Sequence, residues 1–378
     1  MHDRPAPAAG LTLRELGFPT GRLPTGPGNR LSDVPGVRVG HESIVRGDGR
    51  LCRGEGPVRT GVTAVWPHAG DPFQEKVKAG VHVINGFGKT AGLSQVVELG
   101  SLETPILLTN TLNVGLVADA IVEAMIRANQ EIGVTTGTVN PVVGECSDAW
   151  LNDIQGRHVR AEHVAVALRE AGPGGPAGGS VGAGTGMVAF GYKAGIGQAS
   201  REWDAGGLVV RLGALVLANF GARGDLVILG VPVGRLAPPG SEVPPPAAII
   251  GGSAIIVLAT DAPLDSRQLA RLARRAVVGL ARTGSHVAHG SGDFVIAFST
   301  ANREPHRAAP PVVSEHRLLD HSPAFDQLLR GVGEATEEAV YNALFLAGPM
   351  TGRDGHHAPA LSAEPVGGLL AASRRVLG

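Results

Sequence analysis

Two apolar runs in the second half of the chain follow glycine-rich turns. The first covers residues 254–259 (AIIVLA) and the second covers residues 294–298 (FVIAF). Short runs of this kind, rich in β-branched and aromatic residues, are typical of strands buried on both faces. Further strands or buried extended segments are predicted at residues 61–66, 81–84, 105–110, 133–143, 187–192, 207–219 and 226–230.

Helical periodicity is clearest in three segments. Apolar residues recur at intervals of three and four positions over residues 114–128, 264–281 and 323–346. Gly284 follows the second segment as a stop signal. Strands and helices therefore alternate in an order that suits two sheets, each faced by helices.

Two stretches rich in glycine or proline interrupt this pattern, at residues 171–187 and 232–248. Both predict loops, and neither requires a domain boundary. Residues 1–27 have the character of an N-terminal arm. We therefore expect one catalytic domain over residues 28–378.

The overall charge argues against polyanionic partners. The formal net charge is −1, and the basic residues are scattered apart from a short patch at residues 271–275. Nucleic acid and anionic membrane surfaces are therefore not expected partners. The start of the chain lacks the pattern of a secretory signal, and no apolar stretch is long enough to span a membrane, so a cytoplasmic protein is expected. Cys52 and Cys146 have no metal-binding spacing.

The junction Gly251-Gly252-Ser253 places a hydroxyl residue where a proline-rich loop enters the first buried strand. If the Gly252–Ser253 bond breaks, Ser253 gains an α-amine with a pKa of roughly 7.7–8.0. Such an amine can accept the hydroxyl proton near neutral pH, which activates the serine as a nucleophile. The alternative interpretation is an ordinary strand that begins after a glycine turn.

Two other segments supply groups that acyl transfer needs. The turn before the second buried strand carries Ser291 and Asp293, a hydroxyl and a carboxylate two positions apart. Asn219 ends another apolar run and offers an uncharged amide that can stabilise an oxyanion. Ser253, Ser291, Asp293 and Asn219 are therefore the candidate catalytic residues.

Several long segments carry a resemblance to a known family. They cover residues 77–115, 144–154, 181–187, 259–264 and 337–356, in addition to the junction and the second turn. Over roughly residues 28–360 the sequence resembles the DmpA-type L-aminopeptidase D-amidase/D-esterase family, which also holds the β-peptidyl aminopeptidases.

The resemblance implies an α/β fold of four layers, αββα, similar to N-terminal-nucleophile hydrolases but differently connected. It implies self-cleavage into residues 1–252 and 253–378 and assembly as a homotetramer of the cleaved heterodimers. It also implies release of N-terminal residues from small peptides, amino-acid amides or esters through an acyl-enzyme on Ser253, without a cofactor or metal. Glu145 would bind the substrate ammonium, and Trp150 is a candidate pocket wall.

Other functions are compatible with parts of the sequence. An ornithine acetyltransferase-like acyltransferase resembles this fold and self-cleaves, but it normally uses threonine where this chain has Ser253. A non-catalytic binding protein would keep the chain uncleaved. Residues 86–90 (GFGKT) fail the phosphate-loop spacing, since Val83 stands where that loop needs glycine. The preference among L-, D- and β-aminoacyl substrates stays open.

Overall fold

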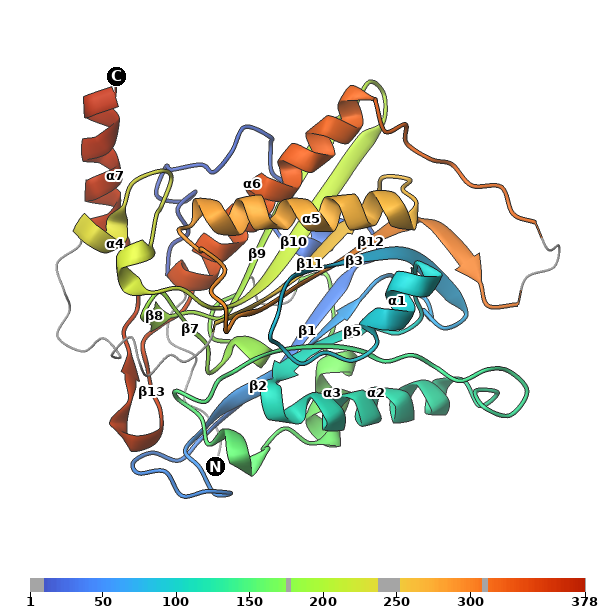
Figure 1. Ribbon diagram of the computed structural model, residues 1–378, viewed down its shortest axis with the longest axis horizontal. Coiled ribbons are helices and arrows are strands. Elements are labelled where there is room, and N and C mark those ends of the chain that lie inside the picture. Colours follow the sequence, from blue (N-terminus) through green and yellow to red (C-terminus); the bar gives the residue numbers. More distant parts are fainter. Residues whose placement is uncertain (1–9, 175–177, 237–251, 308–311, 378) are drawn as a thin grey trace.

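The computed structural model describes residues 10–174, 178–236, 252–307 and 312–377. Two sheets lie face to face, and helices cover the outer face of each (Figure 1). Helices α5 and α6 pack on the larger sheet, whereas α2 and α3 pack on the smaller one. The predicted four-layer αββα architecture is confirmed. Gly251 and most of the proline-rich loop lie outside the described residues.

The larger sheet has six strands in the order β4-β3-β12-β11-β10-β9. Its central pair, β11 and β12, is parallel because helix α5 provides the crossover between them, and the other pairs are antiparallel. The bounds are β3 Glu75–Gly86, β4 Ser101–Leu102, β9 Ile196–Asp204, β10 Val209–Asn219, β11 Ser253–Thr260, β12 Gly292–Pro305 and α5 Ser266–Arg282.

The smaller sheet has the order β1-β2-β5-β6, and α2 provides the crossover between the parallel strands β5 and β6. Two short hairpins, β7–β8 and β13–β14, lie outside both sheets. The bounds are β1 Arg38–Arg46, β2 Val58–Trp66, β5 Ile106–Asn110, β6 Val142–Cys146, β7 Val188–Ala189, β8 Tyr192–Lys193, β13 Met350–Thr351 and β14 His357–Ala358. The remaining helices are α1 Leu93–Leu99, α2 Val114–Ala128, α3 Ala161–Arg169, α4 Val233–Leu236, α6 Pro323–Phe345 and α7 Ala363–Leu377.

Strand β11 is buried on both faces, as its apolar run predicts. Ile255 and Val257 point into the core between the sheets, while Ile256 and Leu258 pack in the core beneath α5 and α6. Full burial of one such side chain contributes about 1.5–3 kcal/mol to folding. A strand of this kind is a rigid support for the residue at its beginning.

The three predicted helices are confirmed as α2, α5 and α6, and local signals explain where two of them begin. Asp265 caps α5 by accepting the N–H of Gln268, whose side chain in turn accepts the N–H of Asp265. Ser322 caps α6 by accepting the N–H of Phe325. These caps satisfy backbone donors that would otherwise have no partner.

Two predicted strands are wrong for most of their length. Residues 133–141 form turns and loop, and the strand begins only at Val142. Residues 226–230 form a turn in which Ile228 makes a single bridge to Val231. In this second segment the apolar side chains of Leu226 and Ile228 anchor a turn in the core, a role that hydrophobicity alone does not distinguish from a strand.

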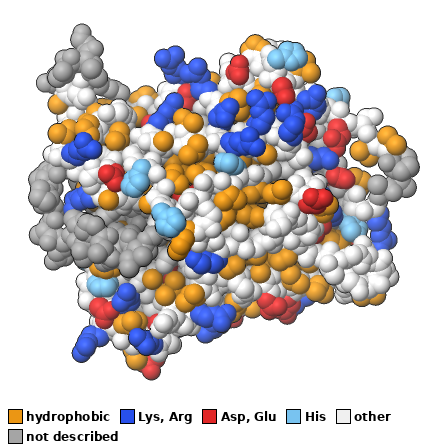
Figure 2. Space-filling view, in the orientation of Figure 1, with side chains coloured by type: hydrophobic (Ala, Val, Ile, Leu, Met, Phe, Trp, Pro, Cys, Tyr) orange, Lys and Arg blue, Asp and Glu red, His pale blue; other side chains and the backbone are white. Residues whose placement is uncertain are grey.

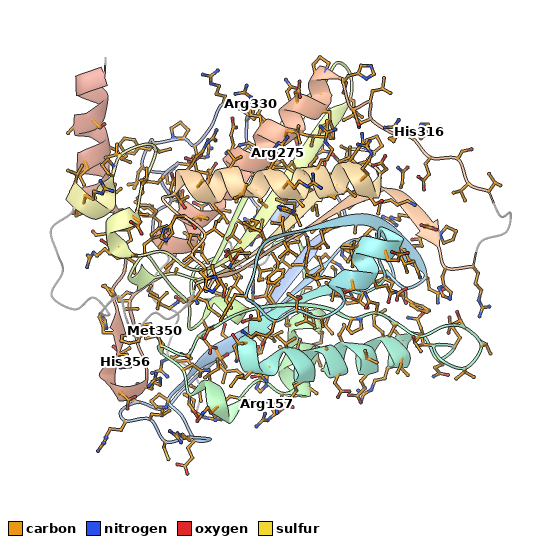
Figure 3. The ribbon with its side chains drawn as sticks, in the orientation of Figure 1. Arg157, Arg275, His316, Arg330, Met350 and His356 are labelled. Atoms are coloured by element: carbon orange, nitrogen blue, oxygen red, sulfur yellow. The ribbon has the colours of Figure 1, made fainter. Side chains whose placement is uncertain are left out.

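The basic patch predicted near residue 271 lies on α5. Figure 2 shows Lys and Arg side chains gathered over this helix, and Figure 3 places Arg275 there and Arg330 on α6. Asp320 partly neutralises the patch, because it forms ion pairs with Arg267 and Arg271. Among the residues that the structure describes, no helix is both long and apolar enough to cross a membrane.

Candidate active site

Ser253 is the first residue of β11, and the sheet register places one residue of each neighbouring strand beside it. It pairs with Asn219 at the end of β10 and with Gly292 at the start of β12. Ser253 and Asn219 are each 6% exposed. The structure therefore brings the junction, the second turn and the end of the Asn219 strand to one edge of the six-stranded sheet.

Ser253 and Asn219 point toward the same side of the sheet. Side chains alternate along a strand, and Ile255 and Leu217, each two positions away, lie in the core between the two sheets. Ser253 and Asn219 share that inner face and are opposite one another in the antiparallel ladder. An amide donor is thus next to the candidate nucleophile.

Ser291 and Asp293 lie on the opposite face. In the parallel ladder Ala254 is opposite Asp293, and Ala254 belongs to the core beneath the helices. A Cβ built on Gly252 would lie 3.2 Å from Ser291 Oγ. The pair therefore flanks the backbone of Gly252 and the peptide bond to Ser253, rather than the Ser253 side chain.

The Ser291–Asp293 pair is buried and hydrogen-bonded. Ser291 Oγ donates to Asp293 Oδ1 at 2.8 Å, and Oδ2 has no partner among the described atoms. Burial raises the pKa of Asp293 to about 6, against the opposing effects of the Ser291 hydroxyl and the Ala254 N–H. A carboxyl with this pKa can gain or lose a proton near neutral pH.

The carbonyl group of Gly252 is held by a backbone donor. Its oxygen accepts the N–H of Gly292 at 3.0 Å. This is the carbonyl that Ser253 would attack in self-cleavage. A donor already at this oxygen is in place to stabilise the negative charge that would develop there.

The orientation of the Asn219 amide is fixed from the neighbouring hairpin. Val188 in β7 donates its N–H to Asn219 Oδ1 at 3.1 Å, so this atom is the oxygen and the NH₂ group is the remaining donor. Val188 pairs with Lys193 of β8. Lys193 is buried and donates to the carbonyl of Gly184 at 3.1 Å, which holds the glycine-rich loop of residues 182–187 beside the site.

Glu145 reaches the site from the smaller sheet. It lies in β6, is 2% exposed, and accepts the N–H of Lys89 at 2.8 Å and the hydroxyl of Thr111. Burial raises its pKa, while these two donors oppose the shift. A Cβ built on Gly88 would lie 3.2 Å from Glu145 Oε1 and 3.0 Å from Gly292 Cα. Glu145 is therefore close to the strand end that carries Ser253's partner.

The narrow space at Gly88 leads to a first prediction. Replacing Gly88 with alanine would place a methyl group 2.7 Å from the Phe294 ring and 3.0 Å from the Gly292 backbone. The ring or the backbone must therefore move. We expect kcat/KM on aminoacyl p-nitroanilides to fall roughly 10- to 100-fold, because displacement of about 1 Å near reacting groups has effects of that size.

The matched control is Gly137→Ala, since an added Cβ at Gly137 meets no atom within 4 Å. This variant should keep the parental kcat/KM. A folded Gly88→Ala protein with parental kcat/KM would show that this space is not part of the site.

Trp150 contacts a different set of side chains. Its ring stacks on His356 with centroids 3.8 Å apart, and it packs against the small core cluster of Leu151, Val188 and Ala358. Val188 of this cluster also donates its N–H to Asn219. Its assignment as a pocket wall stays a prediction.

Sequence reasoning did not assign roles to Gly88, Thr111 or Gly292. Residues 86–90, which fail the phosphate-loop spacing, form a loop that passes Glu145 and the start of β12. His289 stands two positions before Ser291. Its ring lies 6.2 Å from that of Phe87, and among the described residues it forms no hydrogen bond with Ser253.

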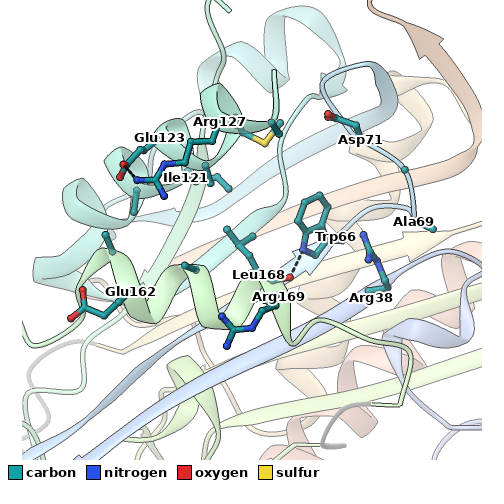
Figure 4. Close-up of a pocket in the computed structure, with 17 residues that line it drawn as sticks. Arg38, Trp66, Ala69, Asp71, Ile121, Glu123, Arg127, Glu162, Leu168 and Arg169 are labelled. Atoms are coloured by element: carbon teal, nitrogen blue, oxygen red, sulfur yellow. Dashed lines mark hydrogen bonds and ion pairs between the residues drawn. The ribbon is translucent and has the colours of Figure 1, made fainter. Parts of the chain in front are cut away.

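A separate cavity of about 810 Å³ lies between α2 and α3 (Figure 4). Trp66, Ile121 and Leu168 form part of its apolar lining, and charged side chains such as Arg38 and Asp71 line it as well. None of the predicted site residues lines it. It lies on the outer side of the smaller sheet, away from Ser253.

The chain belongs to a family of peptidases. The model of peptidase family S58 matches residues 29–358, and the protein is accordingly a hydrolase. A β-peptidyl aminopeptidase from Sphingosinicella microcystinivorans, BapA, is 39% identical over 362 residues, which cover 93% of this chain and 89% of that protein.

Two solved structures share the fold over almost their whole length. The PH0078 protein of Pyrococcus horikoshii OT3 has a TM-score of 0.90 and 47% identity, covering 96% of this chain and 99% of that one. The L-aminopeptidase D-Ala-esterase/amidase of Ochrobactrum anthropi has a TM-score of 0.88 and 38% identity, with the same coverage. The latter is described as a prototype of the serine aminopeptidases and a new variant of the Ntn hydrolase fold.

Proposed function

We propose that this protein is a self-processing aminopeptidase that cleaves its own Gly252–Ser253 bond and then acts through an acyl-enzyme on Ser253. The observation that carries the proposal is the arrangement at this bond. The Gly252 carbonyl accepts the Gly292 N–H, and the hydrogen-bonded Ser291–Asp293 pair flanks the same peptide unit. The names of the Sphingosinicella and Ochrobactrum proteins both include an aminopeptidase activity, which supports the same conclusion.

In self-cleavage, Ser253 Oγ attacks the Gly252 carbonyl carbon, and the Gly292 N–H stabilises the oxyanion. One such donor is typically worth about 10²–10³ in rate. The ionised Ser291–Asp293 pair takes the proton that Ser253 Oγ loses and returns it to the Ser253 nitrogen as the C–N bond breaks, which gives an ester between Gly252 and Ser253 Oγ. Water hydrolyses the ester and releases residues 1–252 and 253–378.

In substrate turnover, the freed α-amine of Ser253 takes the proton of its own hydroxyl while Oγ attacks the carbonyl of the substrate's first residue. The Asn219 amide donates to the oxyanion. The leaving amine or alcohol takes the proton, and water then hydrolyses the acyl-enzyme. Ser291 would lie between Asp293 and the α-amine of Ser253. The negative charge of Asp293 would stabilise this amine when it is protonated.

The substrates of this proposal are small peptides, amino-acid amides and esters with a free amino end, which Glu145 would bind. The domain proposal is an arm of residues 1–27 and one catalytic domain of residues 28–378. The assembly proposal is a homotetramer of cleaved heterodimers. The relatives' names do not favour an acyltransferase or a binding protein.

A denaturing gel with mass spectrometry tests self-cleavage directly. The purified protein should give two fragments that begin at Met1 and Ser253, and p-nitroanilides of α-L, α-D and β residues should then rank its substrate preference. A single intact chain that hydrolyses none of these substrates would contradict the proposal.

A second prediction concerns the substrate's amino group. N-acetylated p-nitroanilides should show kcat/KM at least about 100-fold below the free-amine forms. Acetylation removes the cation and leaves the buried Glu145 carboxylate without its partner, a loss of about 3 kcal/mol. Steady-state kinetics on matched pairs of substrates measures this ratio.

Glu145→Gln provides the control, because glutamine keeps the shape of the side chain and removes its charge. The ratio between free and acetylated substrates should shrink in this variant. Equal turnover of both substrate forms by the parental enzyme would contradict the role of Glu145.

A further inference from the structure

A buried thiol lies directly beneath the candidate nucleophile. Cys146 ends strand β6 and is 0% exposed. Its Sγ lies 3.6 Å from the carbonyl oxygen of Leu217, to which the thiol donates. Burial raises the pKa of the Cys146 thiol, and the nearby Ser253 hydroxyl opposes this shift. The exposed Cys52, by contrast, lies far along the chain from every site residue.

The packing of the two sheets supports this contact independently. A Cβ built on Gly144 would lie 3.0 Å from Cγ2 of Ile255, so β6 and β11 approach closely there. Cys146 is two residues beyond Gly144, and Ser253 is two residues before Ile255. Because both steps of two keep a side chain on the same face, both side chains point into the core between the sheets.

The hydrogen bond that the Cys146 thiol donates leaves its sulfur as an acceptor toward Ser253. The thiol proton is directed to the Leu217 carbonyl, so the sulfur lone pairs are the groups that remain for the serine hydroxyl. Burial raises the pKa of Cys146 well above its ordinary value, which keeps it as a neutral thiol. Cys146 therefore does not compete with Ser253 as a nucleophile.

We propose that Cys146 is a positioning residue whose sulfur accepts a hydrogen bond from the Ser253 hydroxyl in the resting state and holds Oγ in one rotamer until its proton is taken up for attack. A serine side chain has three staggered rotamers, and attack requires Oγ in a fixed direction relative to the carbonyl carbon. The Leu217 carbonyl orients the thiol, and the thiol in turn orients the hydroxyl. This inference rests on the proposed role of Ser253 as the nucleophile.

Cys146→Val tests the proposal, because valine fills a similar apolar space without the acceptor. We expect kcat per cleaved active site to fall roughly 10- to 100-fold with little change in KM, and self-cleavage to slow in parallel. Cys146→Ser keeps an acceptor and should restore most of the kcat. Active sites are counted by the burst of acyl-enzyme, and fragment release is followed on gels.

Val142→Ala is the matched control, since Val142 lies on the same face of β6, four residues before Cys146, in the same core. It should lower the melting temperature and leave kcat unchanged. If valine at position 146 prevents folding, Cys146→Ala must show the same loss of kcat, because alanine introduces no clash.

A folded Cys146→Val or Cys146→Ala enzyme with parental kcat would overturn the inference, as would an equal loss of kcat in Val142→Ala. Failure of the proposed function has a different signature. In that case a Ser253→Ala chain would remain active, whatever the Cys146 variants do.

Discussion

Replacing Ser253 with alanine is expected to leave a folded, uncleaved chain with no aminopeptidase activity. In the proposed mechanism Ser253 supplies both the oxygen that attacks Gly252 and the amino terminus that serves as the base. Alanine fits the first position of β11 without steric conflict, because it is smaller than serine. Mass spectrometry of the purified variant, with p-nitroanilide assays and a melting curve, measures all three properties.

Ser299→Ala is the matched control for this prediction. Ser299 is a buried serine of β12 at the opposite end of the β11–β12 ladder, where its hydroxyl donates to the Ala262 carbonyl. This variant should lose some stability but still cleave and turn over substrate. A fragment that begins at residue 253 in preparations of Ser253→Ala would contradict the proposed self-cleavage.

Replacing Asp293 with asparagine should slow both self-cleavage and turnover by roughly 10²–10⁴, the range typical of a general acid–base group. Asparagine keeps the shape of the side chain and removes the charge that, in the proposed mechanism, orients Ser291 and supports the α-amine of Ser253. The measurement is kcat per cleaved, folded active site. A residue with only a structural role in the turn would lower stability by about 1 kcal/mol and leave kcat unchanged.

The raised pKa of Asp293 gives this prediction a pH signature. In the uncleaved chain the carboxyl ionises near pH 6, so the rate of self-cleavage should rise as the pH passes through this value. The rise should be absent in Asp293→Asn. Cleavage of freshly synthesised chain on either side of pH 6 measures it.

Stability should change in the opposite direction with pH. Because the folded-state pKa of about 6 is above the unfolded value of about 3.9, the folded chain binds more protons between these values. The contribution of Asp293 to stability is therefore largest below about pH 4 and declines as the pH rises through 6. Asp293→Asn should flatten this part of the stability curve. If the Asp293→Asn protein melts early yet turns over at the parental rate, the catalytic assignment of Asp293 is contradicted.

The sequence alone determined much of the local structure. The apolar run after Ser253 predicted a buried strand, and the periodicity of residues 114–128 and 264–281 predicted two of the covering helices. Local patterns also located Ser253, Ser291, Asp293 and Asn219 at strand ends, because glycine turns and apolar runs mark where strands begin. The same patterns failed at residues 133–141, where apolar residues lie in turns.

Only the tertiary structure decided how these residues face one another. The register of β11 with β10 and β12 sets Ser253 and Asn219 on the inner face and the Ser291–Asp293 pair on the other. The approach of the two sheets brings Glu145 and Cys146 to the same edge from a strand more than 100 residues earlier. Strand order, register and sheet packing depend on contacts between distant segments, so periodicity along the chain carries no information about them.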